Sequence, residues 1–324
     1  MNVKIVIVGA GLSGLTAAAV LKENGLTDVT LIDKGRSPGG RLATRRIGGG
    51  RADHGAQFFT VRTDELKKRT AQWLEAGWIK EWYADPYPRY TGTEGMNSLA
   101  KKLAADLDVR TDMKIVRVEE VPGGFQLFSE KGESIQSAAV LLTIPAPQAA
   151  ELLNASSIPG AKELEEIKFN PCLAALVTVK EKSSIGDHGH LDRSLPDGIE
   201  RMADQSAKGI SPVPITVIYM TGEWSKEHFE MADDEILSLI LKKAEAYIGE
   251  GNVEAVQLKK WRYAEAVKPY QHPFLDLNQK HPFLIAGDAF LKENDPAGRT
   301  RFESAYLSGT AAGEELVRRM RDSI

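Results

Sequence analysis

The sequence predicts an α/β protein of two domains, the first of which is a Rossmann-like dinucleotide-binding domain. Its 324 residues suggest two domains, at about 150 residues for each. An apolar run near the N-terminus is followed by a glycine-rich turn and an Ala-rich helical stretch, as at the start of a βαβ unit. A second short apolar run then ends on an acidic residue, which completes the pattern of a dinucleotide site.

The first strand, turn and helix occupy residues 5–24. Ile5–Val8 is short, β-branched and continuously apolar, which is typical of a buried parallel strand. It leads into the turn 9–14, which has the sequence Gly-Ala-Gly-Leu-Ser-Gly. Leu15–Asn24 has the composition of a helix, and Gly25 ends it.

The spacing of this turn fits a bound dinucleotide. Gly9 permits the sharp turn, Gly11 lets the backbone approach a pyrophosphate, and Gly14 lets helix and strand pack closely. The helix N-terminus supplies N–H donors to the phosphates. Asp33 follows a predicted strand over 29–32 and lies 19 positions after Gly14. Its carboxylate is suited to the ribose hydroxyls, and it disfavours the 2′-phosphate of NADP at this site.

Two further stretches carry a family resemblance. Residues 34–46 contain Arg-Ser-Pro-Gly-Gly-Arg directly after the acid, and residues 53–59 have the sequence Asp-His-Gly-Ala-Gln-Phe-Phe. With the glycine turn, they resemble the FAD-dependent amine oxidase superfamily and, more closely, its renalase branch. The resemblance implies an α/β two-domain flavoprotein, with a Rossmann-like FAD-binding domain and an inserted α+β substrate domain. We expect FAD as a non-covalent cofactor.

The expected domains are discontinuous. The FAD-binding domain is assigned to residues 1–62, 92–157 and 275–324, and the substrate domain to 63–91 and 158–274. Helices are expected over 66–82, 99–107 and 234–247, and strands over 108–118, 125–128, 134–142, 173–179, 214–220 and 283–288.

The cofactor contacts combine the glycine turn with positions that match the family. The resemblance also implies that a terminal helix over 298–312 points its N-terminus at the flavin, where its dipole stabilises the negative charge of the reduced ring. The expected cofactor-binding residues are Gly9, Ala10, Gly11, Leu12, Ser13, Gly14, Asp33, Lys34, Gly40, Arg41, Gly55, Ala56, Gln57, Ile115, Thr143, Gly287, Asp288, Arg301, Phe302 and Ala305.

The chemistry that the resemblance implies is carried by the flavin. A renalase-like enzyme takes hydride from a dihydronicotinamide, an isomeric form of NAD(P)H, and passes the electrons to O2 to give H2O2. A dihydropyridine is a strong hydride donor, so no catalytic protein residue is assigned. His54 is open to interpretation as a base or as a hydrogen-bonded loop residue. The candidate residues of the substrate pocket are Gln57, Tyr90, Trp261 and Arg301.

Two other functions remain open. The first is a flavin amine oxidase for a small amine, although Arg301 matches a position where such enzymes present a tyrosine, and a cation there would repel an ammonium group. The second is a flavin-binding protein without turnover. Both share the cofactor motifs, so the residues that bind FAD do not separate them.

Composition narrows the partners and the compartment. There are 41 Lys and Arg residues against 45 Asp and Glu residues, a net charge of −4, which excludes a broad basic face for nucleic acid or an anionic membrane. No apolar run reaches the roughly 18 residues of a spanning helix. Met1 leads into the first strand without a basic leader, so we expect a cytoplasmic protein without a nucleic-acid or membrane partner.

The cysteine count bears on metals and on the flavin linkage. Cys172 is alone, which excludes an intrachain disulfide and a multi-cysteine metal site and agrees with a reducing compartment. It is far in sequence from the terminal motif, which favours a dissociable flavin. His188 and His190 invite a metal interpretation, but no acidic or cysteine cluster accompanies them, so we expect a surface loop and no metal.

Overall fold

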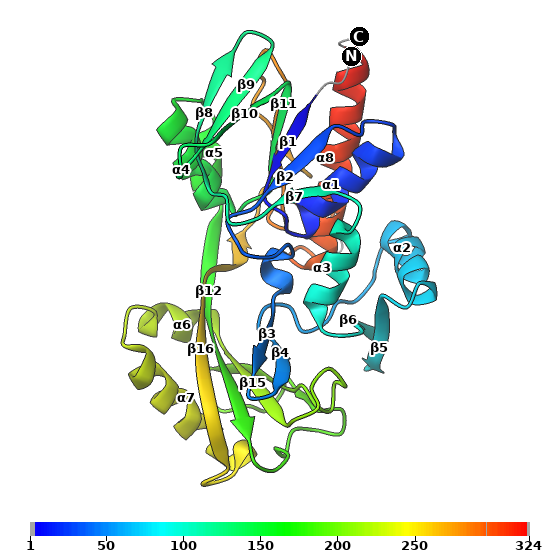
Figure 1. Cartoon of the computed structure of the whole chain (residues 1–324). Helices are drawn as coiled ribbons and strands as arrows, with labels where there is room; N and C mark the ends of the chain where they lie inside the picture. The colour runs from blue at the N-terminus through cyan, green and yellow to red at the C-terminus, as the bar shows by residue number, and fades with distance from the viewer. Residues whose placement is uncertain (1–3, 296, 323–324) are drawn as a thin grey trace.

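The computed structural model describes residues 4–295 and 297–322, and a six-stranded sheet forms its upper half in the view of Figure 1. The strand order is β17-β18-β11-β1-β2-β7. These strands are β1 (Ile5–Val8), β2 (Val29–Ile32), β7 (Asp108–Arg110), β11 (Ala139–Leu142), β17 (Leu275–Asp276) and β18 (Phe283–Ile285). Strands β18 to β7 run parallel, and β17 pairs antiparallel at the edge.

Two apolar layers cover this sheet because its strands are apolar on both faces. Ile5 and Ile7 pack with helices α1 (Leu12–Glu23), α3 (Met96–Ala104) and α8 (Phe302–Asp322). Val6 and Val8 pack with α4 (Ala146–Ser156), α5 (Ala161–Glu165) and the meander of β8 (Ile115–Val121), β9 (Gly124–Ser129) and β10 (Ser134–Ser137). The strand predicted over 5–8 is confirmed, and so are its burial and its parallel pairing.

The second half of the molecule is an antiparallel sheet with the order β13-β14-β15-β12-β16. Its strands are β12 (Lys168–Val179), β13 (His190–Leu191), β14 (Ile199–Asp204), β15 (Ile215–Met220) and β16 (Val253–Lys268). Helices α6 (Gly222–His228) and α7 (Asp233–Ile248) lie against one face (Figure 1). The hairpin of β3 (Thr44–Ile47) and β4 (Gly50–Asp53) packs on the other.

Several predicted elements are wrong in their extent, and three of them are divided or cut short by a turn. The helix expected over 66–82 is α2 (Asp64–Glu75), which ends before Gly77 at φ +67°, and β5 (Ile79–Ala84) follows it and pairs with β6 (Pro88–Gly92). The strand expected over 108–118 is divided between two sheets, with Asp112 at φ +54° between β7 and β8. Residues 134–142 are likewise divided between β10 and β11, and β11 confirms the separate buried strand that the apolar run 140–145 predicts, although it ends at Leu142.

Helix α2 lies closer to the first half than its assignment to the substrate domain suggests. Its buried residues Leu66 and Trp73 join the core of α1 and α8. The following strand β5 reaches the second half, where Lys80 donates to the carbonyl of Gly209 at 2.9 Å. In the described ranges, no helix combines the length and apolarity needed to cross a membrane.

The packing of α8 against α1 depends on two glycines of α8. A Cβ atom on Gly309 would lie 2.3 Å from the carbonyl oxygen of Ser13 in α1, and one on Gly313 would lie 3.1 Å from that of Ala17. Glycines four residues apart share one helix face, so they let the two backbones approach. The crossing brings the first turn of α1 beside α8.

Replacing Gly309 with alanine tests this crossing. We expect Gly309→Ala to lower the free energy of unfolding by about 1–3 kcal/mol, because backbone must move to admit the methyl group. Urea unfolding followed by circular dichroism measures the change. Glu314→Ala, at an exposed position of the same helix, is the control and should leave the midpoint unchanged. Equal midpoints for both variants would contradict the expectation.

Candidate functional site

The glycine turn is held by contacts that side chains larger than hydrogen would block. A Cβ atom on Gly14 would lie 2.1 Å from the carbonyl oxygen of Gly9. Thr143, at the end of β11, donates to the same carbonyl at 2.8 Å. The carboxylate of Asp33 accepts from the backbone N–H groups of Ala10 and Gly35, both at 2.7 Å. Strand β1, strand β2 and strand β11 therefore end together at this turn.

The start of α1 has the properties of an anion site. Gly11 is the N-cap, and no side chain caps the helix. A Cβ atom on Gly11 would meet nothing within 4 Å, so open space lies beside the turn. The buried hydroxyl of Ser13 has no hydrogen-bond partner among the described residues. Open space, uncapped donors and a free hydroxyl fit the pyrophosphate of a dinucleotide.

A second glycine pair packs against this turn. Gly39, at φ +122°, donates its N–H to the carbonyl of Ala10 at 2.7 Å. A Cβ atom on Gly40 would lie 3.5 Å from the Cα of Gly11. The two glycine-rich motifs that the sequence singled out thus meet in space and enclose one backbone-lined site.

Arg41 follows in a short 3-10 turn, η1 (Gly40–Leu42), and joins three distant segments. Its guanidinium forks onto the carboxylate of Asp288 after β18, with one contact of 2.8 Å, and donates to the carbonyl of Ala264 at 3.1 Å. The pairing of β12 with β16 is irregular at Pro171, so Ala264 lies outside the regular register of the two strands. Arg41 is therefore engaged by a carboxylate, so it fixes the site rather than offering a free charge to a phosphate.

The chain then passes back over η1 at residues 55–56. Ala56 donates its N–H to the carbonyl of Arg41 at 2.9 Å. A Cβ atom on Gly55 would lie 2.0 Å from that carbonyl oxygen, so only glycine fits. The small residues expected beside the flavin ring lie directly on the turn that binds Asp288.

Beneath this loop lies a polar network that the sequence did not reveal. Lys208 and Asp53 form an ion pair of 2.6 Å, with both side chains 0% exposed. Lys208 also donates to Gln57 at 3.0 Å, and Tyr219 donates to the carbonyl of Gly55 at 2.9 Å. Burial lowers the pKa of Lys208, and the charge of Asp53 opposes this shift. Gln205 completes the network by accepting from the N–H of Asp53 at 3.0 Å.

The four substrate-pocket candidates have different surroundings. Gln57 is 2% exposed and belongs to this network, so it supports the loop from behind. The ring of Tyr90 lies 5.6 Å from that of Phe59 in a strand bridge. Arg301 pairs with Asp295 at 2.6 Å and with Glu303 at 3.1 Å, so its charge is compensated. Trp261 borders the loop itself, since its indole N–H donates to the carbonyl of His54 at 2.6 Å.

The remaining cofactor candidates lie around the same turns. Gly287 donates to Ser308 at 2.9 Å and so ties β18 to α8, in which Ala305 lies. Phe302 stacks on Phe59 at 4.1 Å at the start of that helix. Ile115 begins β8, two residues after the N–H of Met113 donates to the carbonyl of Asp33 at 3.0 Å. Lys34 donates to Gln148 at 3.0 Å.

His54 lies in a positive field. Its ring stacks on Trp261 at 5.4 Å. Burial, together with the smaller effect of the Lys259 and Arg45 charges, lowers the pKa of His54 to about 4. Its Nδ1 atom has no hydrogen-bond partner among the described residues. The imidazole is therefore neutral at pH 7.

On the other side of Trp261, the sheet presents a mixed group of charges. Cys172 is the register partner of Trp261, and burial raises the pKa of its thiol to about 12. Glu200 and Arg201 form an ion pair at a register irregularity of β14, and both remain more than one third exposed. Burial and the neighbouring Glu200 raise the pKa of Glu265. Irregularities of this kind redirect side chains beside functional sites.

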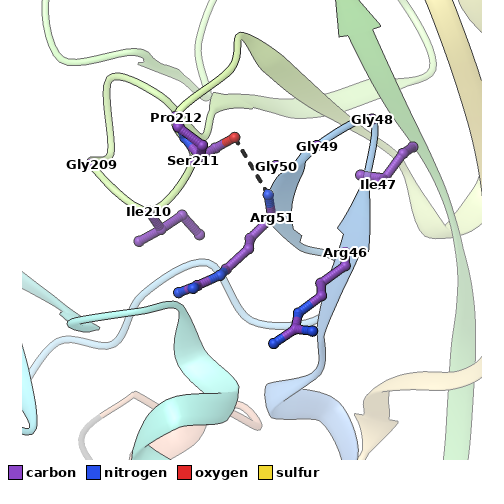
Figure 2. A pocket seen from close by; sticks show the side chains of 10 residues that line it. All are labelled: Arg46, Ile47, Gly48, Gly49, Gly50, Arg51, Gly209, Ile210, Ser211 and Pro212. Atoms are coloured by element: carbon purple, nitrogen blue, oxygen red, sulfur yellow. Dashed lines mark hydrogen bonds between the residues drawn. The ribbon is translucent and has the colours of Figure 1, made fainter.

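A separate depression of about 780 Å³ lies between the β3–β4 turn and residues 209–212. Figure 2 shows the Arg46 and Arg51 side chains extending in the same direction from its neighbouring strands. None of its lining residues is among the predicted site residues. Over residues 4–295 and 297–322, no group of three or more His, Cys, Asp or Glu residues is arranged to hold a metal ion.

The open space at Gly11 supplies a direct test of the dinucleotide site. Gly11 has φ −76°, and a side chain there would meet no protein atom. We expect Gly11→Val to fold normally and to lose at least tenfold in FAD affinity, because the side chain fills the space assigned to the pyrophosphate. Flavin fluorescence titration of the apoprotein measures affinity, and circular dichroism checks the fold. Unchanged affinity would place the pyrophosphate elsewhere.

The buried ion pair makes a separate prediction about stability. Lys208→Met should lower the free energy of unfolding by about 3–5 kcal/mol, because it leaves the Asp53 carboxylate buried without its cation. Lys182→Met, at an exposed position, should be neutral. The double variant Asp53→Asn with Lys208→Met should recover part of the loss in urea unfolding. A double variant that is less stable than Lys208→Met alone would argue against the pair.

Comparisons with known proteins agree with this geometry. Residues 7–71 match the NAD(P)-binding Rossmann-like domain, and residues 76–317 match the family of flavin containing amine oxidoreductases. Hydroxyneurosporene desaturase from Rubrivivax gelatinosus is 46% identical over 59 residues, which is 18% of this chain and 11% of that protein.

Solved structures show the same fold over almost the whole chain. A protein of Exiguobacterium sp. 255-15 assigned as a protoporphyrinogen oxidase has a TM-score of 0.69 and 14% identity, covering 98% of this chain and 99% of that one. Putrescine oxidase bound to putrescine has a TM-score of 0.66 and 13% identity, covering 98% and 99%. With the dinucleotide site and the family match over residues 76–317, the chain belongs to the flavin-containing amine oxidoreductase family, and it is an FAD-dependent oxidoreductase.

Proposed function

We propose that this enzyme oxidises a dihydronicotinamide, an isomeric form of NAD(P)H, in the manner of the renalase branch. When bound, FAD supplies the hydride acceptor at N5 and transfers the electron pair to O2, which gives H2O2. The observation that carries the proposal is the positive field at the His54–Trp261 stack. The charges of Lys259 and Arg45, which add to the effect of burial on the pKa of His54, would repel an ammonium substrate, whereas a neutral dihydropyridine with an anionic tail is compatible with them.

The titratable groups nearest the proposed flavin position suit a reaction without a protein base. His54 is a weak base because its pKa is lowered to about 4, and burial keeps the Tyr219 phenol and the Cys172 thiol protonated by raising their pKa values. Oxidation of a dihydropyridine requires no proton removal from carbon, because hydride leaves a ring that becomes aromatic. The protein therefore contributes binding, orientation and charge stabilisation.

Each of these tasks falls to a described part of the chain. The start of α1 and the carboxylate of Asp33 would hold the dinucleotide. Gly55 and Ala56 would lie against the flavin ring, fixed by the carbonyl of Arg41. Trp261 offers a flat surface for a substrate ring beside that loop.

Amine oxidation is the second candidate, and one observation favours it. Glu200 and Glu265 lie beyond Cys172, and carboxylates of this kind can hold an ammonium group. Arg201 neutralises Glu200 through a direct ion pair, so Glu200 is less suited to hold an ammonium group. A flavin protein without turnover would have the same cofactor site.

Anaerobic rapid mixing of the holoenzyme with reductants tests the proposed function. We expect isomeric dihydronicotinamides to bleach the flavin at least tenfold faster than ordinary NAD(P)H or a panel of small amines, with H2O2 formed after oxygen is admitted. Buffer alone is the control for photoreduction. Fast bleaching by amines only would establish amine oxidation, and no bleaching by any compound would favour the non-catalytic alternative.

A further inference from the structure

Two cations, Arg45 and Lys259, lie near the His54–Trp261 stack. Gln257, Lys259 and Trp261 alternate along β16 and so share one face of the strand, opposite Leu176, Ala174 and Cys172. The β3–β4 hairpin packs on this face, where Ala52 contacts the Ala174 and Leu176 cluster. Arg45 is the register partner of Ala52. Arg45 and Lys259 therefore both lie in the region where the hairpin packs on the sheet.

Neither cation is neutralised. Arg45 donates to the amide oxygen of Gln257 at 3.1 Å. Throughout residues 4–295 and 297–322, no carboxylate forms an ion pair with Arg45 or Lys259. Burial and the charge of Arg45 lower the pKa of Lys259. Two like charges held together without an acid cost stability unless an anion joins them.

The position is open to a ligand. Arg45 is exposed and Lys259 is half-buried. A half-buried ammonium and an exposed planar guanidinium together provide the donors that a phosphate group accepts.

We propose that Arg45 and Lys259 bind the phosphate of a nucleotide substrate while its dihydronicotinamide ring lies at Trp261. This inference rests on the proposed function and assigns two residues to the phosphate of its substrate. Lys259 lies two residues from Trp261, about 7 Å along the strand. One ribose joins the ring to the phosphate in such a nucleotide, so a separation of this size suits the two groups.

Truncated substrates test the phosphate site by kinetics. The isomeric forms of dihydronicotinamide mononucleotide and dihydronicotinamide riboside carry the same ring and differ in the phosphate. We expect the wild-type holoenzyme to have a KM at least tenfold lower for the mononucleotide. Lys259→Gln and Arg45→Gln should raise that KM toward the value for the riboside, while the riboside KM and both kcat values stay within about twofold.

Arg46→Gln is the matched control, because Arg46 precedes the hairpin turn on the opposite face of β3 and lines the separate depression of Figure 2. It should leave both KM values unchanged. Equal KM values for mononucleotide and riboside would overturn the inference and leave the proposed function standing. A rise in KM with Arg46→Gln as large as with Lys259→Gln would also overturn it, since it would indicate a diffuse charge effect.

A binding measurement separates this inference from the proposed function. Titration calorimetry of the holoenzyme with inorganic pyrophosphate should detect binding that the double variant of Arg45→Gln and Lys259→Gln loses by at least tenfold. If neither dihydronicotinamide bleaches the flavin but pyrophosphate binds through these residues, the proposed function fails and the anion site stands. Pyrophosphate binding that the double variant retains would remove the site.

Discussion

The buried ion pair of Lys208 and Asp53 is the interaction on which the arrangement of the site depends. Either charge, buried at 0% exposure without its partner, would strongly destabilise the folded state. The fold therefore requires the two side chains to be paired. Asp53 is the last residue of strand β4, and Lys208 lies in the segment that joins β14 to β15 in the second sheet. The pair therefore fixes the position of the second sheet relative to the loop 54–57, which continues from β4 toward the proposed flavin position.

The opposite side of that loop is fixed by backbone contacts. Gly55 lies against the carbonyl of Arg41, whose guanidinium binds Asp288 and the carbonyl of Ala264. The N-terminal turn, the last parallel strand and the long strand β16 thus converge on one side chain. The loop 54–57 is therefore held between the buried network of Lys208 and Asp53 on one side and η1 on the other. This restricts its conformation, and a cofactor site requires such preorganisation.

The sequence was sufficient for the local part of this site, because the glycine turn, its strands and Asp33 lie within 30 residues and each has a steric reason. It was insufficient for Lys208, since a lysine between alanine and glycine has the pattern of a solvated loop, and its partner lies 155 residues away. Arg301 shows the same limit. The sequence shows that position 301 carries a positive charge, but only the folded structure shows that Asp295 and Glu303 neutralise this charge. The helix predicted over 66–82 extended too far because Trp78 continues the apolar spacing of Trp73 and Leu74, although the helix ends before Gly77.

The charges on the two sides of Trp261 bear on substrate orientation. Uncompensated cations lie on the His54 side, whereas the Cys172 side carries Glu200, Arg201 and Glu265. A compensated Arg–Glu pair offers both a donor and an acceptor, which matches a neutral carboxamide better than a full charge. A dihydronicotinamide nucleotide has a carboxamide on its ring and an anion on its tail. The carboxamide suits the Glu200–Arg201 pair, and the anion suits the cations near His54. A diamine has no anion for Arg45 and Lys259 to bind, and these cations would repel its ammonium groups. The asymmetry therefore favours the nucleotide over the amine.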